Sequence, residues 1–366
     1  MYTTLISVDQ LSALRQQGSP LMIFDCSFDL MNPALGQQQY NDAHIPGAVY
    51  VHLDTALSAK GQPDAASGGR HPLPSRETFA AWLGSVGFTN SMQAVVYDRQ
   101  GANYCGRLWW MLKWAGHDNV AVLDGGLQAW QAGGGAISSG AEKSAFVPSK
   151  YALAATKTAL VATETVANNL GRPVQTIIDA RGTPRFKGEV EPLDPVAGHM
   201  PGALNRPFAQ NIGADGKFKP AAQLRAEFEA LLGGRDPATV VHHCGSGVSA
   251  VPNIIAMEVA GLGRTALYAG SWSEWCSDPS RPFAQGLKTL FELAGERAGR
   301  PRRVHFASRG RLGLLFEVTA LTLLLARGLG GSREQLRCPV AATRHACGGG
   351  PIGLEEKPSR GQLLWI

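Results

Sequence analysis

The chain has 366 residues, 44% of them hydrophobic, which is enough for two domains of ordinary size with a core each. Its net charge of +5 arises in the last segment: residues 287–366 carry 13 Lys and Arg against 6 Glu, a net +7, which leaves −2 for residues 1–286. A slightly acidic body argues against nucleic acid as a partner, and six scattered cysteines with no C-x-x-C pair argue against a zinc site or a disulfide framework.

Residues 1–11 show no basic region followed by an apolar run of signal-peptide length, which predicts a cytoplasmic protein. From there on, short apolar runs typical of buried strands alternate with stretches whose apolar spacing is typical of helices. The predicted strands include residues 21–25, 94–97, 177–179 and 239–242, and the predicted helices include 75–86 and 222–232. This alternation predicts an α/β fold with mainly parallel sheets flanked by helices.

An internal repeat relates the two halves of the chain. The motif HIPGA at 44–48 returns as HMPGA at 199–203, and residues 94–130 align with 239–275 at a constant shift of 145. The larger shift of 155 at the first motif places about ten extra residues in the first half, within the loop-like segment 58–70. We therefore expect two duplicated domains, 1–135 and 159–286, joined by a linker at 136–158 that begins in a Gly-, Ser- and Ala-rich stretch.

The strongest signal for a functional site is the segment 240–250, an apolar strand followed by a small-residue loop and a predicted helix. Cys244 lies at the bend, where open α/β folds bind ligands. Gly245 and Gly247 let the loop backbone aim its N–H groups inward, and the helix adds the positive end of its dipole. This cradle for an anion predicts that Cys244 is a nucleophilic thiolate at neutral pH. The pattern indicates no metal and no organic cofactor.

The loop CGSGVS at 244–249 resembles the active-site loop of the tandem-domain rhodanese family, most of all its mercaptopyruvate sulfurtransferase branch. The segments DGGLQAW at 124–130 and GSWSEW at 270–275 are similar to the family's domain-closing motifs, so the resemblance covers about residues 4–286. It implies two rhodanese-like domains, of which the first contributes to the cleft but is catalytically silent, because Arg99 stands where the second half has Cys244.

The resemblance also implies an activity. A sulfane sulfur would move from 3-mercaptopyruvate to Cys244 as a persulfide, and then to a thiol, a thioredoxin-like protein or cyanide, with release of pyruvate. Within the loop, the residues expected to contact the donor are Gly245, Gly247, Val248 and Ser249. No cofactor, nucleic acid or membrane span is expected.

Residues outside the loop acquire roles from the same resemblance. Arg185 falls on the family's substrate-binding arginine, whose planar fork suits a carboxylate. Asp54 and His71 match, together with Ser246, a relay that handles the thiol proton of the donor. A second substrate arginine that many members have is replaced here by Leu193, which puts substrate affinity in doubt.

The closing motif of the second half departs from the family too. Members usually have an aspartate before Gly-Ser-Trp, whereas this chain has Ala269, so one hydrogen bond that braces the loop is expected to be missing.

Three other functions are compatible with parts of this pattern. Thiosulfate-preferring rhodaneses usually carry basic residues after the cysteine, so the uncharged Gly245 and Ser246 favour mercaptopyruvate, with thiosulfate:cyanide sulfur transfer as the alternative. A non-catalytic sulfur-relay or interaction module is a second alternative, against which the intact Cys244 loop and Arg185 argue. Cysteine phosphatases and arsenate reductases need an arginine six residues after the cysteine, where this chain has Ala250.

Residues 287–366 form a basic extension beyond the usual end of the family. Their richness in Arg, Gly and Leu and their lack of Asp and Tyr predict a largely disordered segment. The apolar stretch 312–325 is too short to span a bilayer and contains Glu317. The alternative for this stretch is an amphipathic helix that docks on a partner or a membrane surface.

Overall fold

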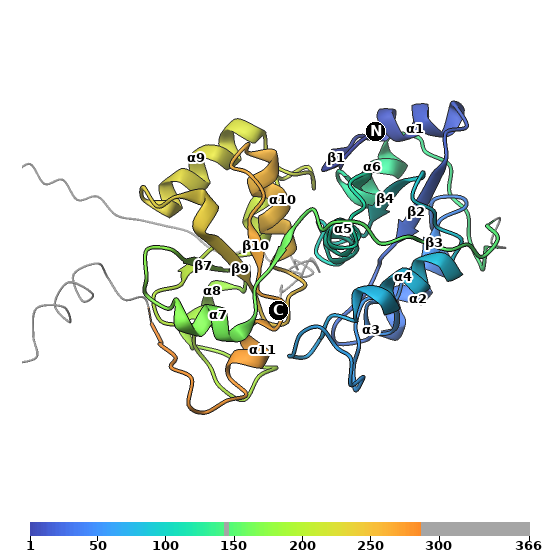
Figure 1. Ribbon diagram of the computed structural model, residues 1–366. Coiled ribbons are helices and arrows are strands. Elements are labelled where there is room, and N and C mark those ends of the chain that lie inside the picture. The colour runs from blue at the N-terminus through green and yellow to red at the C-terminus, as the bar shows by residue number, and fades with distance from the viewer. Residues whose placement is uncertain (143–145, 287–366) are drawn as a thin grey trace, which may run out of the picture. The chain divides into compact units, whose positions relative to one another are not determined.

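The computed structural model describes residues 1–142 and 146–286 (Figure 1). The basic extension predicted at 287–366, and both interpretations of it, lie outside the described residues. Within the described residues, no helix has the length and apolar character needed to cross a membrane.

The first half of the chain forms a five-stranded parallel sheet in the order β1-β5-β4-β2-β3. Its strands are β1 (Leu5–Ile6), β2 (Leu21–Asp25), β3 (Val49–Tyr50), β4 (Gln93–Tyr97) and β5 (Val120–Leu123). Its helices are α1 (Val8–Gln16), α2 (Ala34–Asp42), α3 (Leu53–Ala56), α4 (Arg76–Ser85), α5 (Cys105–Trp114) and α6 (Gly126–Ala132). The central strand β4 is buried along its whole length, as its apolar run predicts for a strand covered on both faces.

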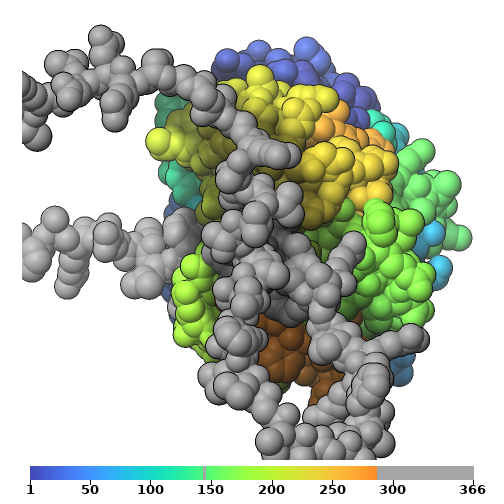
Figure 2. All heavy atoms as spheres, turned by 90° about the vertical axis from the view of Figure 1, so that its left-hand side faces the viewer, coloured from blue at the N-terminus to red at the C-terminus, as the bar shows by residue number. Residues whose placement is uncertain are grey.

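The second half repeats this sheet in the order β6-β10-β9-β7-β8, again with every pair parallel. Its strands are β6 (Ala159–Leu160), β7 (Thr176–Asp179), β8 (Leu204–Asn205), β9 (Val240–His243) and β10 (Ala266–Leu267). Its α-helices are α7 (Thr163–Asn168), α8 (Thr183–Lys187), α9 (Ala221–Leu232), α10 (Val251–Val259) and α11 (Ser271–Trp275), with 3-10 turns η1 (Phe208–Asn211) and η2 (Pro237–Thr239). Figure 2 shows the outer face of this half, where the yellow atoms belong to the segment around α9. The equal strand orders confirm the predicted pair of α/β units with parallel sheets.

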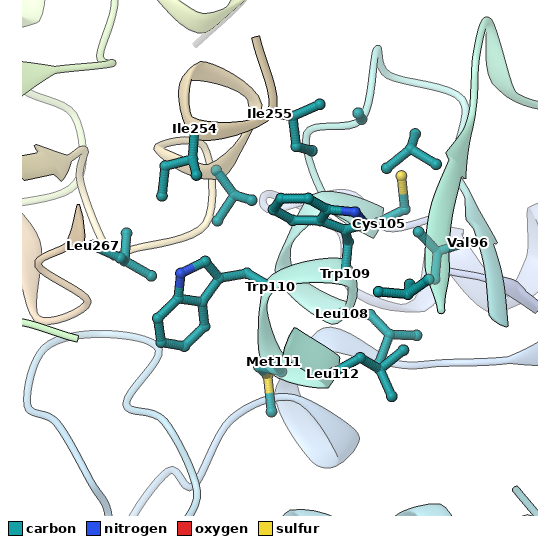
Figure 3. Packing of buried hydrophobic residues seen from close by; sticks show 14 of the residues in the cluster. Val96, Cys105, Leu108, Trp109, Trp110, Met111, Leu112, Ile254, Ile255 and Leu267 are labelled. Carbon is teal, nitrogen blue, oxygen red and sulfur yellow. The ribbon is translucent and has the colours of Figure 1, made fainter. Parts of the chain in front are cut away.

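Helices α5 and α10 occupy equivalent positions in the repeat and pack against each other, which joins the two halves through one core (Figure 3). All ten residues of α5 are buried. At Gly106 a side chain would lie only 3.3 Å from Val251, so the glycine permits the close approach of the two helices. Trp109 and Trp110 are fully buried beside Ile254 and Ile255, and truncating either tryptophan would cost about 3–5 kcal/mol of stability.

Candidate active site at the Cys244 loop

Cys244 directly follows β9, the central strand of the second sheet, at its carboxyl end. Its backbone N–H donates to Ser271 Oγ (3.1 Å), and its carbonyl accepts from the N–H of Trp272 (3.0 Å). The carbonyl of Gly245 likewise accepts from the N–H of Ser273 (2.9 Å). The start of α11 therefore holds the first turn of the loop in place.

The loop is also held at Gly247, which has a φ of +73°. A Cβ at this position would lie 2.2 Å from the carbonyl oxygen of Ala269, so only glycine allows the loop to press against the residue before α11. The sequence predicts that the loop lacks one stabilising hydrogen bond, because Ala269 stands where family members usually have an aspartate. In the structure, contacts with the backbone around Ala269 and with Ser271 hold the loop at this point.

The backbone N–H groups between Gly245 and Ala250 donate to no acceptor within residues 1–142 and 146–286. In the first half, the equivalent cradle is filled by a carboxylate of the chain itself. Asp98 Oδ1 accepts from the N–H groups of Gln100 and Ala102, and Asp98 Oδ2 accepts from those of Tyr104 and Cys105. Asp98 thus uses four N–H groups of the first-half loop, whereas the N–H groups of the second-half loop have no acceptor in the described residues and are available to an external anion.

Arg99 occupies the position that corresponds to Cys244 in the repeat. Its guanidinium lies 3.3 Å from Asp25 and donates to the carbonyl of Gln39 (3.0 Å). The first half thus offers a paired cation where the second half offers a thiol.

The structure brings His71, Asp54 and Ser246 together beside the Cys244 loop. His71 Nδ1 lies 2.7 Å from Ser246 Oγ, and His71 Nε2 lies 3.4 Å from Asp54 Oδ1, which is long for a hydrogen bond. Burial lowers the pKa of His71 although Asp54 opposes this shift, so the imidazole is neutral near pH 7. With Nε2 protonated toward Asp54, Nδ1 is left to accept the hydroxyl proton of Ser246.

Asp54 has a second partner that no sequence motif marks. The ammonium of Lys60 lies 2.5 Å from Asp54 Oδ1. The nearby His71 and the ammonium of Lys60 together hold the pKa of Asp54 well below its usual value. The carboxylate therefore stays ionised and orients the ring of His71.

Cys244 opens onto a cavity of about 80 Å³. Its lining includes most of the residues predicted for the site: His71, Arg185, Cys244, Gly245, Ser246, Val248 and Ser249. Two predicted residues stand apart from the lining: Asp54 lies behind His71, and Gly247 fixes the loop. A larger cavity of about 680 Å³ lies beside β2 and β3, and none of the described residues that line it is a cysteine.

Among the residues that the structure describes, three arginines line the Cys244 cavity. Arg185 is held by Glu191 (2.6 Å) and Asp194 (3.1 Å). Arg70 also binds Asp194 (2.6 Å), and its Nη2 lies 3.1 Å from where a Cβ on Gly245 would be. That Arg185 binds the carboxylate of the donor stays a prediction, and Arg70 is a second cation close enough to share this charge.

The third arginine, Arg181, is turned toward the protein. It binds the buried carboxylate of Asp179 at 2.7 Å and stacks over Trp272 with its guanidinium carbon 4.6 Å from the ring centre. This pairing occupies its donors, so Arg181 is less available to a ligand than Arg70 and Arg185.

The loop of extra residues in the first half delivers Arg70 and His71 to the second half. Gly69 has a φ of +85°, and a Cβ there would lie 2.4 Å from the carbonyl oxygen of Gly270. The backbone N–H of Arg70 donates to Ser273 Oγ (3.0 Å). The segment 58–70 is thus docked on the residues that also brace the Cys244 loop, and both parts of the site share one support.

A family model described as a Rhodanese-like domain matches residues 7–133 and 162–278. The chain belongs to the rhodanese-like family. Each matched segment contains four of the five strands of one sheet, so the family's domain is present in two tandem copies.

Members of this family with assigned names are similar over most of the described chain. A probable 3-mercaptopyruvate sulfurtransferase from Pseudomonas aeruginosa is 43% identical over 283 residues, 77% of this chain and 98% of that protein. A putative thiosulfate sulfurtransferase from Mycobacterium tuberculosis is 39% identical over 285 residues, 77% of this chain and 97% of that protein. The crystal structure of the 3-mercaptopyruvate sulfotransferase SseA from Escherichia coli superimposes with a TM-score of 0.62 at 30% identity, covering 75% of this chain and all of that one.

Proposed function

We propose that this protein is a 3-mercaptopyruvate sulfurtransferase in which Cys244 carries the sulfur. The observation that carries the proposal is the contact of His71 with Ser246, 2.7 Å, on the loop that begins with Cys244. A rhodanese-type cysteine alone serves any sulfane donor, whereas a neutral histidine bonded to a hydroxyl can also accept a proton during the reaction. Mercaptopyruvate carries such a proton on its sulfur, and thiosulfate at neutral pH carries none.

In the first half-reaction the Cys244 thiolate attacks the sulfur of mercaptopyruvate. The new S–S bond forms as the C–S bond breaks, and the electron pair of that bond stays with carbon as the enolate of pyruvate. The thiol proton leaves through Ser246 to His71 and returns to the enolate carbon, so pyruvate is released and Cys244 is left as a persulfide. No electron is gained or lost overall, and no further reactant is needed.

In the second half-reaction a thiolate or cyanide takes the outer sulfur and returns Cys244 to its thiolate form. The N–H groups between Gly245 and Ala250 support the persulfide anion between the two steps, since they have no other acceptor in the described residues. A thiol, a thioredoxin-like protein or cyanide fits this step equally, because each presents one nucleophilic atom.

The first half of the chain is proposed to take no sulfur of its own. It has Arg99 at the cysteine position, and Asp98 fills the cradle that would stabilise an anion. Its contribution is Arg70 and His71, which line the cavity of the second half, together with Asp54, which lies behind His71. The domain limits at 135 and 159 and the cytoplasmic location stay predictions.

Thiosulfate is the second candidate donor. The pairing of Arg70 with Arg185 at one cavity suits a dianion as well as a carboxylate, and a relative with 39% identity is named for thiosulfate. Steady-state rates decide between the donors: we expect kcat/KM for mercaptopyruvate to exceed that for thiosulfate at least tenfold. A higher kcat/KM for thiosulfate than for mercaptopyruvate would make the protein a thiosulfate sulfurtransferase.

Arg185→Ala is expected to raise KM for mercaptopyruvate about 30-fold. The variant loses a charge-assisted hydrogen bond to the carboxylate, about 2 kcal/mol, in the ground state and in the transition state alike. Arg70→Ala should have an effect of similar size, since its guanidinium lies near the same loop. Steady-state kinetics of both variants measure this. Arg225→Ala, which removes a guanidinium on the exposed face of α9, is the control and should leave KM unchanged. An unchanged KM in both Arg185→Ala and Arg70→Ala would place the carboxylate elsewhere.

A further inference from the structure

Arg107, on helix α5 of the first half, is a fully buried arginine beside the active site. Its guanidinium donates only to backbone carbonyls among the described residues: that of Gly247 (3.0 Å), that of His71 (2.9 Å) and that of Leu57 (3.3 Å). No carboxylate within residues 1–142 and 146–286 forms an ion pair with it. A fully buried arginine without a carboxylate partner is rare in proteins.

The three carbonyls border the three members of the proposed relay. Gly247 directly follows Ser246, and the second carbonyl belongs to His71 itself. Leu57 ends the short helix α3, whose first turn carries Asp54. A single planar guanidinium thus ties together three chain segments that are distant in sequence.

We propose that Arg107 is the positioning residue of the relay: it fixes the distance and orientation of His71 relative to Ser246 by holding the backbone of both. This inference rests on the proposed function, since it needs a working relay. Helix α5 suits the task because Trp109 and Trp110 anchor it in the core that joins the two halves (Figure 3). The repeat itself does not require this contact, because the equivalent position in α10 is Pro252.

The electrostatics of the site agree with this role. Burial lowers the pKa of Arg107 to about 10, and the nearby Cys244 opposes that shift. Arg107 in turn helps to keep His71 neutral, since its positive charge lowers the pKa of that imidazole in addition to the larger effect of burial. The guanidinium therefore maintains both the position and the protonation state that the relay needs.

The test is a double-mutant cycle between Arg107 and His71, with turnover of both donors as the readout. Arg107→Lys keeps the buried charge but cannot span three carbonyls in one plane, and Arg107→Gln keeps an N–H donor without the charge. Each rate is divided by the amount of protein whose Cys244 forms a persulfide on incubation with thiosulfate. Only folded protein with a reactive Cys244 is then counted. Lys113→Met is the matched control, because Lys113 is a buried cation on the same helix, bound to Asp118 away from the site.

Arg107→Lys is expected to lower kcat for mercaptopyruvate about 10- to 100-fold, as misplacement by a fraction of an ångström does, and to change thiosulfate turnover far less. In a His71→Ala background the same substitution should have no further effect on mercaptopyruvate. The proposal would be overturned if Arg107→Lys lowered turnover of both donors equally and did so by the same factor in the His71→Ala background. Arg107 would then be a structural residue of the core. A His71→Ala variant without donor selectivity would instead overturn the relay itself, so the two failures are distinct. If Arg107→Lys does not fold, the same cycle is read from Arg107→Gln.

Discussion

Cys244→Ala is expected to abolish sulfur transfer from both donors, with kcat falling at least about 10⁴-fold, because the covalent intermediate forms on this thiol. The fold should survive, since the change removes one small buried sulfur at a cost of about 1 kcal/mol. Steady-state assays of pyruvate and thiocyanate formation, with a thermal unfolding curve of the same sample, measure both effects.

Cys276→Ala is the matched control for Cys244. Its thiol is half-buried at the end of α11 and lies outside the lining of the Cys244 cavity, so activity should remain within about twofold of the parent. Residual turnover in Cys244→Ala that disappears only when Cys276 is also replaced would show that the wrong thiol has been assigned.

His71→Ala is expected to lower kcat for mercaptopyruvate by about 10²–10⁴-fold, the usual cost of a lost general acid or base, while thiosulfate turnover falls far less. The difference follows from the thiol proton, which only mercaptopyruvate carries. His117→Ala is the control, since His117 is likewise a buried histidine with a lowered pKa but contacts the backbone of Asn119 in the core of the first half. An equal fall with both donors would make His71 a structural residue of the junction between the halves.

The pH dependence of kcat for mercaptopyruvate provides a second test of the role of His71. The relay needs neutral His71, because a proton on Nδ1 prevents it from accepting from Ser246. Burial lowers the pKa of His71 below its usual value of 6.5, so kcat for mercaptopyruvate should hold as the pH falls to about 6.5 and decline only below it. In His71→Ala this decline should be absent.

Much of the fold follows from local patterns. The apolar run at 21–25 predicts the strand that the structure places at Leu21–Asp25, and the 3.6-residue spacing at 222–232 predicts α9 to within one residue. The HxPGA motif occurs in both halves and residues 94–130 align with 239–275 at a constant shift, which together predict the duplication. The Cys244 loop is predictable for the same reason: strand, glycines and helix are contiguous in sequence.

The rest of the site depends on how the two halves pack. Arg107 reaches Gly247 across 140 positions of the chain, and Arg70 reaches the Gly245 region across a longer span. The spacing of apolar residues within one helix or strand does not predict contacts between distant segments. An arginine within the apolar run of α5 therefore gives no sign of which residues it will contact. Adjacency to His71 is the one signal that could have marked Arg70.

The most direct test of the account is the mass of the peptide that contains Cys244 after incubation with mercaptopyruvate and no acceptor. We expect this peptide to gain one sulfur atom, about 32 Da, with one pyruvate released per protein, and to lose that sulfur when cyanide is added. Release of pyruvate without a mass change at Cys244, or a gain of sulfur at another cysteine, would contradict the account.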